Sequence, residues 1–188
     1  MSHAELLAPL PARQRREAVA PALARLIDEI DTACADAAPS DRIIAALELA
    51  AAQPGLLTAD QRLPQAGCYA RHAIHGDPAG RFTIVAIVWG PGQFSPIHAH
   101  HAWCAYGVCE GVLEETLYAW DHESGRAQPA RTAVRSPGYG CYADAGLDQI
   151  HRLGNAGMEP AISIHVYGVE RERVGTHVNR VVQAASQA

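Results

Sequence analysis

The chain has 188 residues, of which 48% are hydrophobic and 19% are charged, so it has enough apolar side chains to build one ordinary domain. This composition excludes an intrinsically disordered protein. The formal net charge of -5 argues against nucleic acid or an anionic membrane as the main partner, because both require clustered Lys and Arg. A small molecule is therefore the expected partner.

The N-terminal segment and the cysteines bear on the compartment. The segment MSHAELLAPLPARQRREAVA lacks the basic and then apolar order of a secretory signal, and no apolar run is long enough to span a bilayer. The five cysteines are scattered without a Cys-x-x-Cys pair, which favours free thiols over a disulfide framework or a thiolate zinc site. We therefore expect a cytoplasmic protein, and the sequence predicts no particular oligomeric state.

The first third of the chain has the pattern of helices. From about Arg13 to Ala37, apolar residues recur at spacings of three and four. They are Val19, Leu23, Leu26, Ile27 and Ile30. Ser40 is placed to cap a second helix that contains Ile43, Ile44 and Leu47. We expect residues 1–65 to form a helical segment that packs on a barrel of residues 66–175, followed by an unassigned tail of residues 176–188, all within one structural domain.

After Gly67 the chain changes to short β-branched or aromatic runs separated by turn-forming residues. The runs are CYARHAIH, RFTIVAIVW, WCAYGVCEGVLEETLYAW, RTAVRS and AISIHVYG, and the turns are GDPAG, GPGQ and DHESG. Their order predicts a β-meander, and their spacing is typical of an antiparallel barrel or a double-sheet roll. The predicted fold class is mainly β with α-helices at the N-terminus.

Three histidines are candidates for a single metal site. His98 and His100 are two residues apart on a predicted strand, so their side chains point to the same face. His151, in GLDQIHRLGN, is distant in sequence but within reach in a β-roll. Three neutral imidazoles can hold a divalent ion and leave positions open for a substrate, whereas a closed structural site needs a fourth protein ligand. The alternative is a His-x-His pair that arises by chance among the ten histidines.

The residues around these histidines resemble motifs of the cupin superfamily. Four of them share the spacing of its first motif: Gly92, His98, His100 and Gly111. His151-x-x-x-Asn155 resembles the end of the second motif. Many cupins have a Glu ligand before the last Gly of the first motif, and this sequence has Cys104 there. The resemblance implies a cupin fold, which is a double-sheet β-barrel or jelly roll.

Three histidines with Cys in place of Glu resemble the cysteine dioxygenase family of cupin thiol dioxygenases. Further segments between about Gly67 and Gly168 are similar to segments of that family: Tyr69-Ala70-Arg71, Trp89-Gly90-Pro91-Gly92, Ile150-His151-Arg152 and Ser163-Ile164-His165-Val166-Tyr167. Each segment is short, and their combination is specific. The helical first third contributes no such motif.

The resemblance implies the cofactor and the reaction. In this family three histidines bind Fe(2+), the substrate binds as a thiolate, and both atoms of O2 are added to its sulfur to give a sulfinate. Carried over to this sequence, His98, His100 and His151 are the expected iron ligands. The protein holds metal, thiolate and O2 next to one another in a shielded pocket.

Arg71 is the expected substrate-binding residue, with Tyr69 beside it. In the family this Arg holds the substrate carboxylate, and a guanidinium matches a carboxylate with two parallel hydrogen bonds. Members that prefer mercaptopropionate tend to have Gln here and another Arg after the Tyr, and in this sequence Arg171 and Arg173 follow Tyr167. A site with two Arg would suit a dicarboxylate, so mercaptosuccinate, cysteine and 3-mercaptopropionate are all candidates. A surface salt bridge is the alternative role of Arg71.

Ser163, His165 and Tyr167 alternate along a predicted strand and therefore share one face. They can form a hydrogen-bonded chain in which Ser163 fixes the tautomer of His165 and His165 orients Tyr167. The Tyr167 hydroxyl would then donate to bound oxygen or substrate, so all three are candidate catalytic residues. The alternative is a polar strip that is paired for structural reasons.

Cys104 and Tyr167 are a candidate thioether pair. In some members of the family the Cys of this region is linked to the Tyr of the Ser-x-His-x-Tyr strand, which aims its oxygen at the metal. The interval from His100 to Cys104 is one residue shorter than in cross-linking members, so the linked and the unlinked states both stay open. His101 and Cys109 are expected to be packing residues.

Two other classes of function stay open at this point. A metal-dependent cupin isomerase or hydrolase would use the same histidines with another divalent ion. A metal-free cupin would be a small-molecule-binding module. The joint presence of Tyr167, His165 and Arg71 favours the thiol dioxygenase, because neither alternative needs that set.

Overall fold

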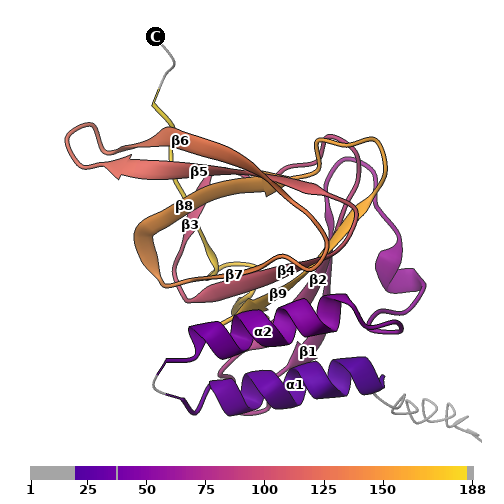
Figure 1. The fold of residues 1–188 in the computed structure, drawn as a ribbon. Coiled ribbons are helices and arrows are strands. Elements are labelled where there is room, and N and C mark those ends of the chain that lie inside the picture. The colour runs from indigo at the N-terminus through magenta and orange to yellow at the C-terminus, as the bar shows by residue number, and fades with distance from the viewer. Residues whose placement is uncertain (1–19, 37, 186–188) are drawn as a thin grey trace, which may run out of the picture.

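A computed structural model describes residues 20–36 and 38–185 of the chain. Within these residues, two five-stranded antiparallel sheets face each other, and two helices lie against the outer side of one sheet (Figure 1). The mainly β class with N-terminal helices, predicted from the sequence, is confirmed. The division at residues 65 and 175 stays a prediction.

The first helix, α1 (Pro21–Ala33), occupies the central part of the first predicted helix. A proline in its first turn suits a helix start, because the missing N–H would have no helical partner there. Leu26 and Ile30 are buried, in agreement with the predicted apolar face. The predicted start at Arg13, the apolar residue Val19 and the predicted end at Ala37 lie outside the described residues.

The second helix, α2 (Ser40–Ala51), begins one residue earlier than the sequence predicts. The expected cap by Ser40 is wrong, because Ser40 is already helical and its side chain makes no capping hydrogen bond. Pro39 has helical backbone angles, and its carbonyl accepts the first helical bond from the N–H of Ile43 at 3.0 Å. The proline therefore occupies the cap position that the sequence assigns to serine.

The first sheet lies next to the helices. Its strands, in spatial order, are β1 (Ala70–Gly76), β2 (Thr83–Trp89), β9 (Ala161–Tyr167), β4 (Cys104–Glu110) and β7 (Gly140–Ala143). Every residue of β2 is buried, because the helical layer covers the outer face and the second sheet covers the inner face. The inner side chains of this sheet form one wall of the site.

The second sheet lies on the side away from the helices. Its strands, in spatial order, are β10 (Asn179–Val181), β3 (His98–His100), β8 (Gly146–Gly154), β5 (Leu113–Asp121) and β6 (Arg126–Arg135). The predicted meander is wrong, because only β1–β2 and β5–β6 are consecutive in both sequence and space. From β2 onward the chain changes sheet after every described strand except β5, so the two sheets are built together and each buries one face against the other.

The remaining segments complete the fold. Short 3-10 helices are present at η1 (Asp60–Arg62) and η2 (Arg171–Arg173). The strand β10, in the segment that the sequence leaves unassigned, pairs with β3 and closes one edge of the second sheet. All five cysteines are free thiols, as predicted. In the described part of the chain, no helix combines the length and hydropathy of a membrane span.

Candidate metal centre

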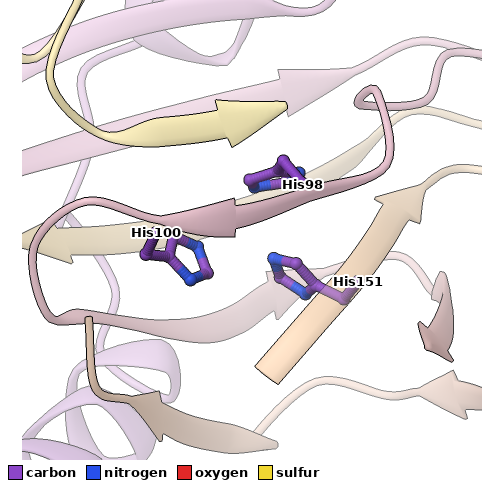
Figure 2. Close-up of side chains that lie close together, drawn as sticks. All are labelled: His98, His100 and His151. Atoms are coloured by element: carbon purple, nitrogen blue, oxygen red, sulfur yellow. The ribbon is translucent and has the colours of Figure 1, made fainter. Parts of the chain in front are cut away.

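The three histidines singled out in the sequence meet between two neighbouring strands of the second sheet. His98 and His100 lie on β3, and His151 lies on β8 directly opposite His98. Each residue offers one ring nitrogen, and these three atoms lie within 4.8 Å of one another. Figure 2 shows the three rings gathered around a common centre. The structure thus brings the predicted ligands together from distant parts of the sequence.

The segment before β3 is bound to β8, which sets the position of His98. The N–H of Ser95 donates to the carbonyl of Leu153 at 2.8 Å, and the N–H of Leu153 donates to Oγ of Ser95 at 3.1 Å. Asn155, at the end of the second motif, is buried, and its amide donates to the carbonyl of Trp89 at 2.9 Å. Asn155 therefore supports the site without lining the cavity beside the histidines, whereas Ser95 and Leu153 also line it.

All three imidazoles are buried, with 6% of His98, 3% of His100 and 8% of His151 exposed. Burial lowers the pKa of His98 to about 3 and that of His100 to about 2, and the electrostatic influence of the neighbouring His151 adds to both shifts. Both rings are therefore neutral near pH 7. Neutral imidazoles offer the lone pairs that metal binding requires.

Hydrogen bonds at Nδ1 orient two of the three rings. The Nδ1–H of His98 donates to the carbonyl of Pro96 at 2.9 Å, and that of His151 donates to Oε1 of Glu115 at 2.7 Å. With the proton on Nδ1, the lone pair of each ring is on Nε2. Nδ1 of His100 is buried without a hydrogen-bond partner among the described residues, which points to a ligand that the protein does not supply. This donor set fits a divalent transition metal.

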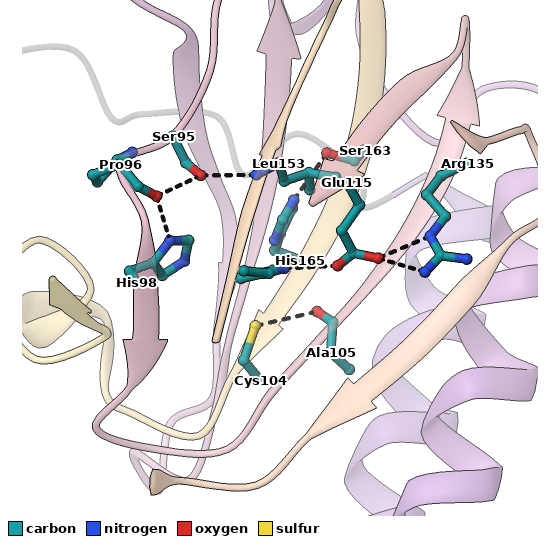
Figure 3. Close-up of polar contacts among 11 residues, drawn as sticks. Ser95, Pro96, His98, Cys104, Ala105, Glu115, Arg135, Leu153, Ser163 and His165 are labelled. Atoms are coloured by element: carbon teal, nitrogen blue, oxygen red, sulfur yellow. Dashed lines mark hydrogen bonds and ion pairs between the residues drawn. The ribbon is translucent and has the colours of Figure 1, made fainter. Parts of the chain in front are cut away.

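Glu115 is a residue of the site that the sequence reasoning missed. It lies on β5 with 3% exposed. One of its oxygens accepts from His151, and the other accepts from Arg135 of β6 (Figure 3). Burial opposes its ionisation, but the hydrogen bonds from His151 and Arg135 outweigh burial and lower the pKa of Glu115 below its ordinary value. The sequence did contain an indication of this burial. Glu115 follows the apolar Leu113 by two residues on the same strand, so both side chains point into the core.

A polar chain runs along the opposite wall, on the first sheet. Nε1–H of Trp89 donates to Oγ of Ser163 at 2.8 Å, and Ser163 and Nε2 of His165 are 2.9 Å apart. The Ser163 hydroxyl accepts from the indole and has one proton and a second lone pair left for its bond with His165, so it suits either tautomer of that ring. Burial lowers the pKa of His165 to about 3, so this ring is neutral near pH 7. Trp89 is a member of the chain that the sequence does not identify.

Tyr167 continues this wall by stacking and not by a hydrogen bond from His165. The two rings are 5.7 Å apart between centroids, with 27° between their planes, and no hydrogen bond joins them in the described residues. Tyr167 lies directly opposite Cys104 across β9 and β4, and both side chains are buried. Burial raises the pKa of both the phenol and the thiol well above their ordinary values. The candidate cross-link pair therefore consists of two neutral groups on adjacent strands.

The rings open into a narrow cavity whose lining includes both walls and the predicted substrate residues. It is lined by Tyr69, Arg71, Ile87, Trp89, Ser95, His98, His100, Cys104, His151, Leu153, His165, Tyr167 and Asn179. Arg71 is exposed on β1, with its guanidinium carbon 5.9 Å from the ring centroid of Tyr69. The Tyr69 ring packs on Trp89 at 4.5 Å between centroids. The guanidinium is thus available at the rim, while the imidazoles lie at the buried end.

The two other candidate arginines lie elsewhere. Arg173 donates to Glu170 at 2.8 Å, and Arg171 packs against Gly76, so neither lines the cavity. The two-arginine arrangement considered from the sequence is therefore not formed in this structure. Asn179 of β10 does line the cavity, and the sequence did not identify it because the tail carried no strand signal.

Comparisons with known proteins agree with the geometry. A family model described as cysteine dioxygenase type I matches residues 14–174. The cysteine dioxygenase type 1 of Homo sapiens is 33% identical over 91 residues, which are 47% of this chain and 45% of the human protein. The enzyme of Danio rerio is 33% identical over 93 residues, with the same shares. The matched part thus spans about half the length of these curated relatives.

Solved structures include similar folds. A protein with a double-stranded β-helix domain from Klebsiella pneumoniae is 21% identical with a TM-score of 0.45. The match covers 63% of this chain and 93% of the Klebsiella chain. A Thermus thermophilus protein, TT1209, is 20% identical with a TM-score of 0.46, and covers 60% of this chain and 96% of its own. From the family match over most of its length, the chain belongs to the cysteine dioxygenase type I family of cupins.

Proposed function

We propose that the protein is an Fe(II)-dependent thiol dioxygenase that adds both atoms of O2 to the sulfur of a small mercapto-carboxylate. The reaction is balanced without another reactant, since a thiol R–SH and O2 together contain every atom of the sulfinic acid R–SO2H. The observation that carries the proposal is the set of three buried imidazole ligands, His98, His100 and His151, which face a cavity rimmed by Arg71. Membership of the cysteine dioxygenase type I family supports it.

The protein residues have separate tasks in this proposal. His98, His100 and His151 would hold the iron as uncharged ligands. Coordination positions on the iron, and its positive charge, would then remain available to the substrate thiolate. Bound Fe(II) would supply adjacent coordination positions for sulfur and O2 and would activate the O2, while the substrate sulfur itself provides the four electrons of the reaction. The buried walls of the cavity exclude water from the reacting atoms.

Arg71 and Tyr69 are the proposed carboxylate-binding residues. The Arg71 guanidinium is exposed at the cavity rim, and no ion pair occupies it in the described residues. A substrate with sulfur at the imidazoles and a carboxylate at this rim would be held at both ends. Cysteine, 3-mercaptopropionate and mercaptosuccinate all have the required two groups. With one arginine in the cavity, a second carboxylate of mercaptosuccinate would need another donor, and Asn179 is a candidate among the polar side chains that line the cavity.

Ser163, His165 and Tyr167, on the wall formed by the first sheet, are the proposed catalytic residues. The bond from Ser163 to His165 fixes the imidazole, and the stacked imidazole limits the orientations of the Tyr167 ring. The phenol keeps its proton near neutral pH and can therefore donate to an oxygen atom of substrate or O2. A thioether from Cys104 to Tyr167 would restrict the ring further. A cytoplasmic location and the absence of nucleic-acid partners stay predictions.

The experiment that tests this function is an oxygen-electrode assay on anaerobically purified protein reconstituted with Fe(II). Each of the three thiols is supplied in turn, and 2-mercaptoethanol serves as a control that lacks the carboxylate. We expect thiol-dependent O2 uptake and, with 18O2, two labelled oxygen atoms in the sulfinate. Zinc-loaded protein should take up no O2. Iron-loaded protein without thiol-dependent uptake, or a product with one labelled atom, contradicts the proposal.

A further inference from the structure

The three imidazoles of the centre are held in different ways, and one is held by a buried charge. His98 donates to a neutral backbone carbonyl, whereas His151 donates to the carboxylate of Glu115 at 2.7 Å. Of the acidic residues that the structure describes, Glu115 alone is buried. The buried negative charge of Glu115 therefore lies beside one of the three imidazoles, His151.

The second oxygen of this carboxylate is held by Arg135. Nε and Nη2 of Arg135 donate to Oε2 of Glu115 at 2.8 and 2.7 Å (Figure 3). The guanidinium carbon lies 4.2 Å from the ring centroid of Tyr139. Both donors converge on Oε2, so this oxygen of the carboxylate is anchored by two charge-assisted hydrogen bonds. The other oxygen, Oε1, is left to accept from His151.

A buried ion pair is a costly way to fill this part of the sheet. Apolar residues of similar volume often stabilise a fold as well or better, because they need no desolvation of charge. The neighbouring inward position on β5 is the fully buried Leu113, which shows that this layer accepts leucine. What leucine could not provide at position 115 is an acceptor for Nδ1–H of His151.

The acceptor determines which nitrogen of His151 faces the centre. Only the tautomer with its proton on Nδ1 can donate to Glu115, so Nε2 keeps its lone pair. A carboxylate partner also increases the basicity of an imidazole ligand. We propose that Glu115, held by Arg135, is a positioning residue of the metal centre that fixes the ring of His151 and makes it the strongest electron donor of the three ligands. This inference rests on the proposed three-histidine metal centre.

The test compares Glu115→Gln with Glu114→Gln. The first variant keeps the size of the side chain but removes the charge, and it cannot satisfy both His151 and Arg135 as the carboxylate does. The second removes the same charge from the adjacent residue, which has the opposite strand phase. Each full-length protein is titrated with Co(II), whose visible absorption reports the ligand field. We expect Glu115→Gln to bind about 10- to 100-fold more weakly, with shifted bands, and Glu114→Gln to match the wild type.

Variants of Arg135 provide a second, graded measurement. Arg135→Lys keeps a charged donor and should bind Co(II) more tightly than Arg135→Met, which leaves Glu115 unheld. Circular dichroism establishes that each variant is folded, and the Arg135 pair decides the question if Glu115→Gln does not fold. Equal Co(II) affinity and equal spectra in wild type, Glu115→Gln and both Arg135 variants would overturn the role of Glu115. Failure of the wild type to bind Co(II) would instead overturn the metal centre itself.

Discussion

The two sheets contribute different chemistry to the same cavity. The second sheet provides the three imidazoles and the buried Glu115–Arg135 pair, on four adjacent strands. The inner face of the first sheet provides groups that are neutral near pH 7, namely the linked side chains of Trp89 and Ser163 and the stacked ring of Tyr167. Only at the exposed rim does the first sheet contribute a charge, from Arg71.

This difference separates metal binding from substrate orientation. A cation held by neutral ligands benefits from a buried anion behind one of them, because charges interact strongly where water is excluded. A small substrate and O2 instead need donors in fixed directions, and neutral hydrogen-bonding groups provide these without adding a competing charge. Damage to the second sheet should therefore affect metal content first, and damage to the first sheet should affect substrate binding and turnover.

The largest effect is expected from His151→Ala, which removes a ligand from the second sheet. Two imidazoles hold a divalent ion less firmly than three, so we expect stoichiometric iron binding and thiol-dependent O2 uptake to fall to background. Metal analysis and the oxygen electrode measure the two quantities. His101→Ala is the matched control, because His101 is exposed and follows β3 directly. A His151→Ala protein with full iron content would contradict the assignment of metal binding to the second sheet.

Arg71→Ala, on the first sheet, should leave iron content unchanged and raise KM. Hydrogen bonds to a charged group contribute about 1.5–3 kcal/mol, which corresponds to an increase in KM of roughly 10- to 100-fold. The increase should be seen for each mercapto-carboxylate substrate and be absent for 2-mercaptoethanol. Arg171→Ala is the control, since Arg171 does not line the cavity. An unchanged KM would exclude the carboxylate role of Arg71.

The thioether between Cys104 and Tyr167 stays a hypothesis, and its formation during aerobic turnover is tested as follows. The thiol and the ring carbon beside the phenol oxygen each lose one hydrogen, a C–S bond forms, and O2 accepts the electrons and protons. Intact-mass measurement should then show the loss of two hydrogen atoms in the wild type and none in Cys104→Ser. Activity of the variant should fall by about 10-fold at most, because fixing one side chain is worth on the order of 1 kcal/mol. A full unlinked mass after turnover counts against the bond.

The smallest effect is expected from a partly exposed ion pair at the edge of the first sheet, in which the Arg81 side chain is 42% exposed and the Asp77 side chain 6%. Arg81 donates to Asp77 at 2.8 Å and also contacts Asp31 of α1, and the Arg81 hydrogen bonds lower the pKa of Asp77 to about 2. Because the folded pKa lies below the unfolded value, this stabilisation is present at neutral pH and is lost as the pH falls from about 4 to about 2.

Asp77→Asn should therefore lower the thermal midpoint at pH 7 by about 1 to 4 °C, as expected for a partly exposed pair in a chain of this length. The difference from wild type should shrink as the pH falls toward the folded pKa of about 2 and vanish below it, as followed by circular dichroism. Asp148→Asn, an exposed substitution of the same kind, is the control. A constant difference at every pH would show that Asp77 acts through packing and not through its charge.

Local periodicity explains what could be predicted. Side-chain alternation in a strand depends on backbone geometry alone, so the sequence determined that His98 and His100 share a face, as Ser163 and His165 do. The same reasoning located most strands, and the spacing of apolar residues located both helices. The motifs around His151 added the third ligand through family resemblance, since no local pattern relates it to His98.

The order of the strands required the tertiary structure. An alternating pattern is compatible with several pairings, and the choice among them depends on which faces bury each other. The meander expected from the sequence pairs β2 with the strand that follows it, whereas in the structure β2 pairs with β9 from the end of the chain. The short β10 has little pattern of its own and becomes a strand because β3 offers it an edge.

The sequence by itself determined the class of fold, the identity of the three imidazoles and the family to which their spacing belongs. Only the tertiary structure decided that Glu115 stands behind His151, that Trp89 begins the polar chain, and that Arg71 alone among the candidate arginines reaches the cavity. The physical reason is that these relations join residues far apart in sequence. They arise from the packing of one sheet on the other and from strand pairing, neither of which is encoded in the order of neighbouring residues.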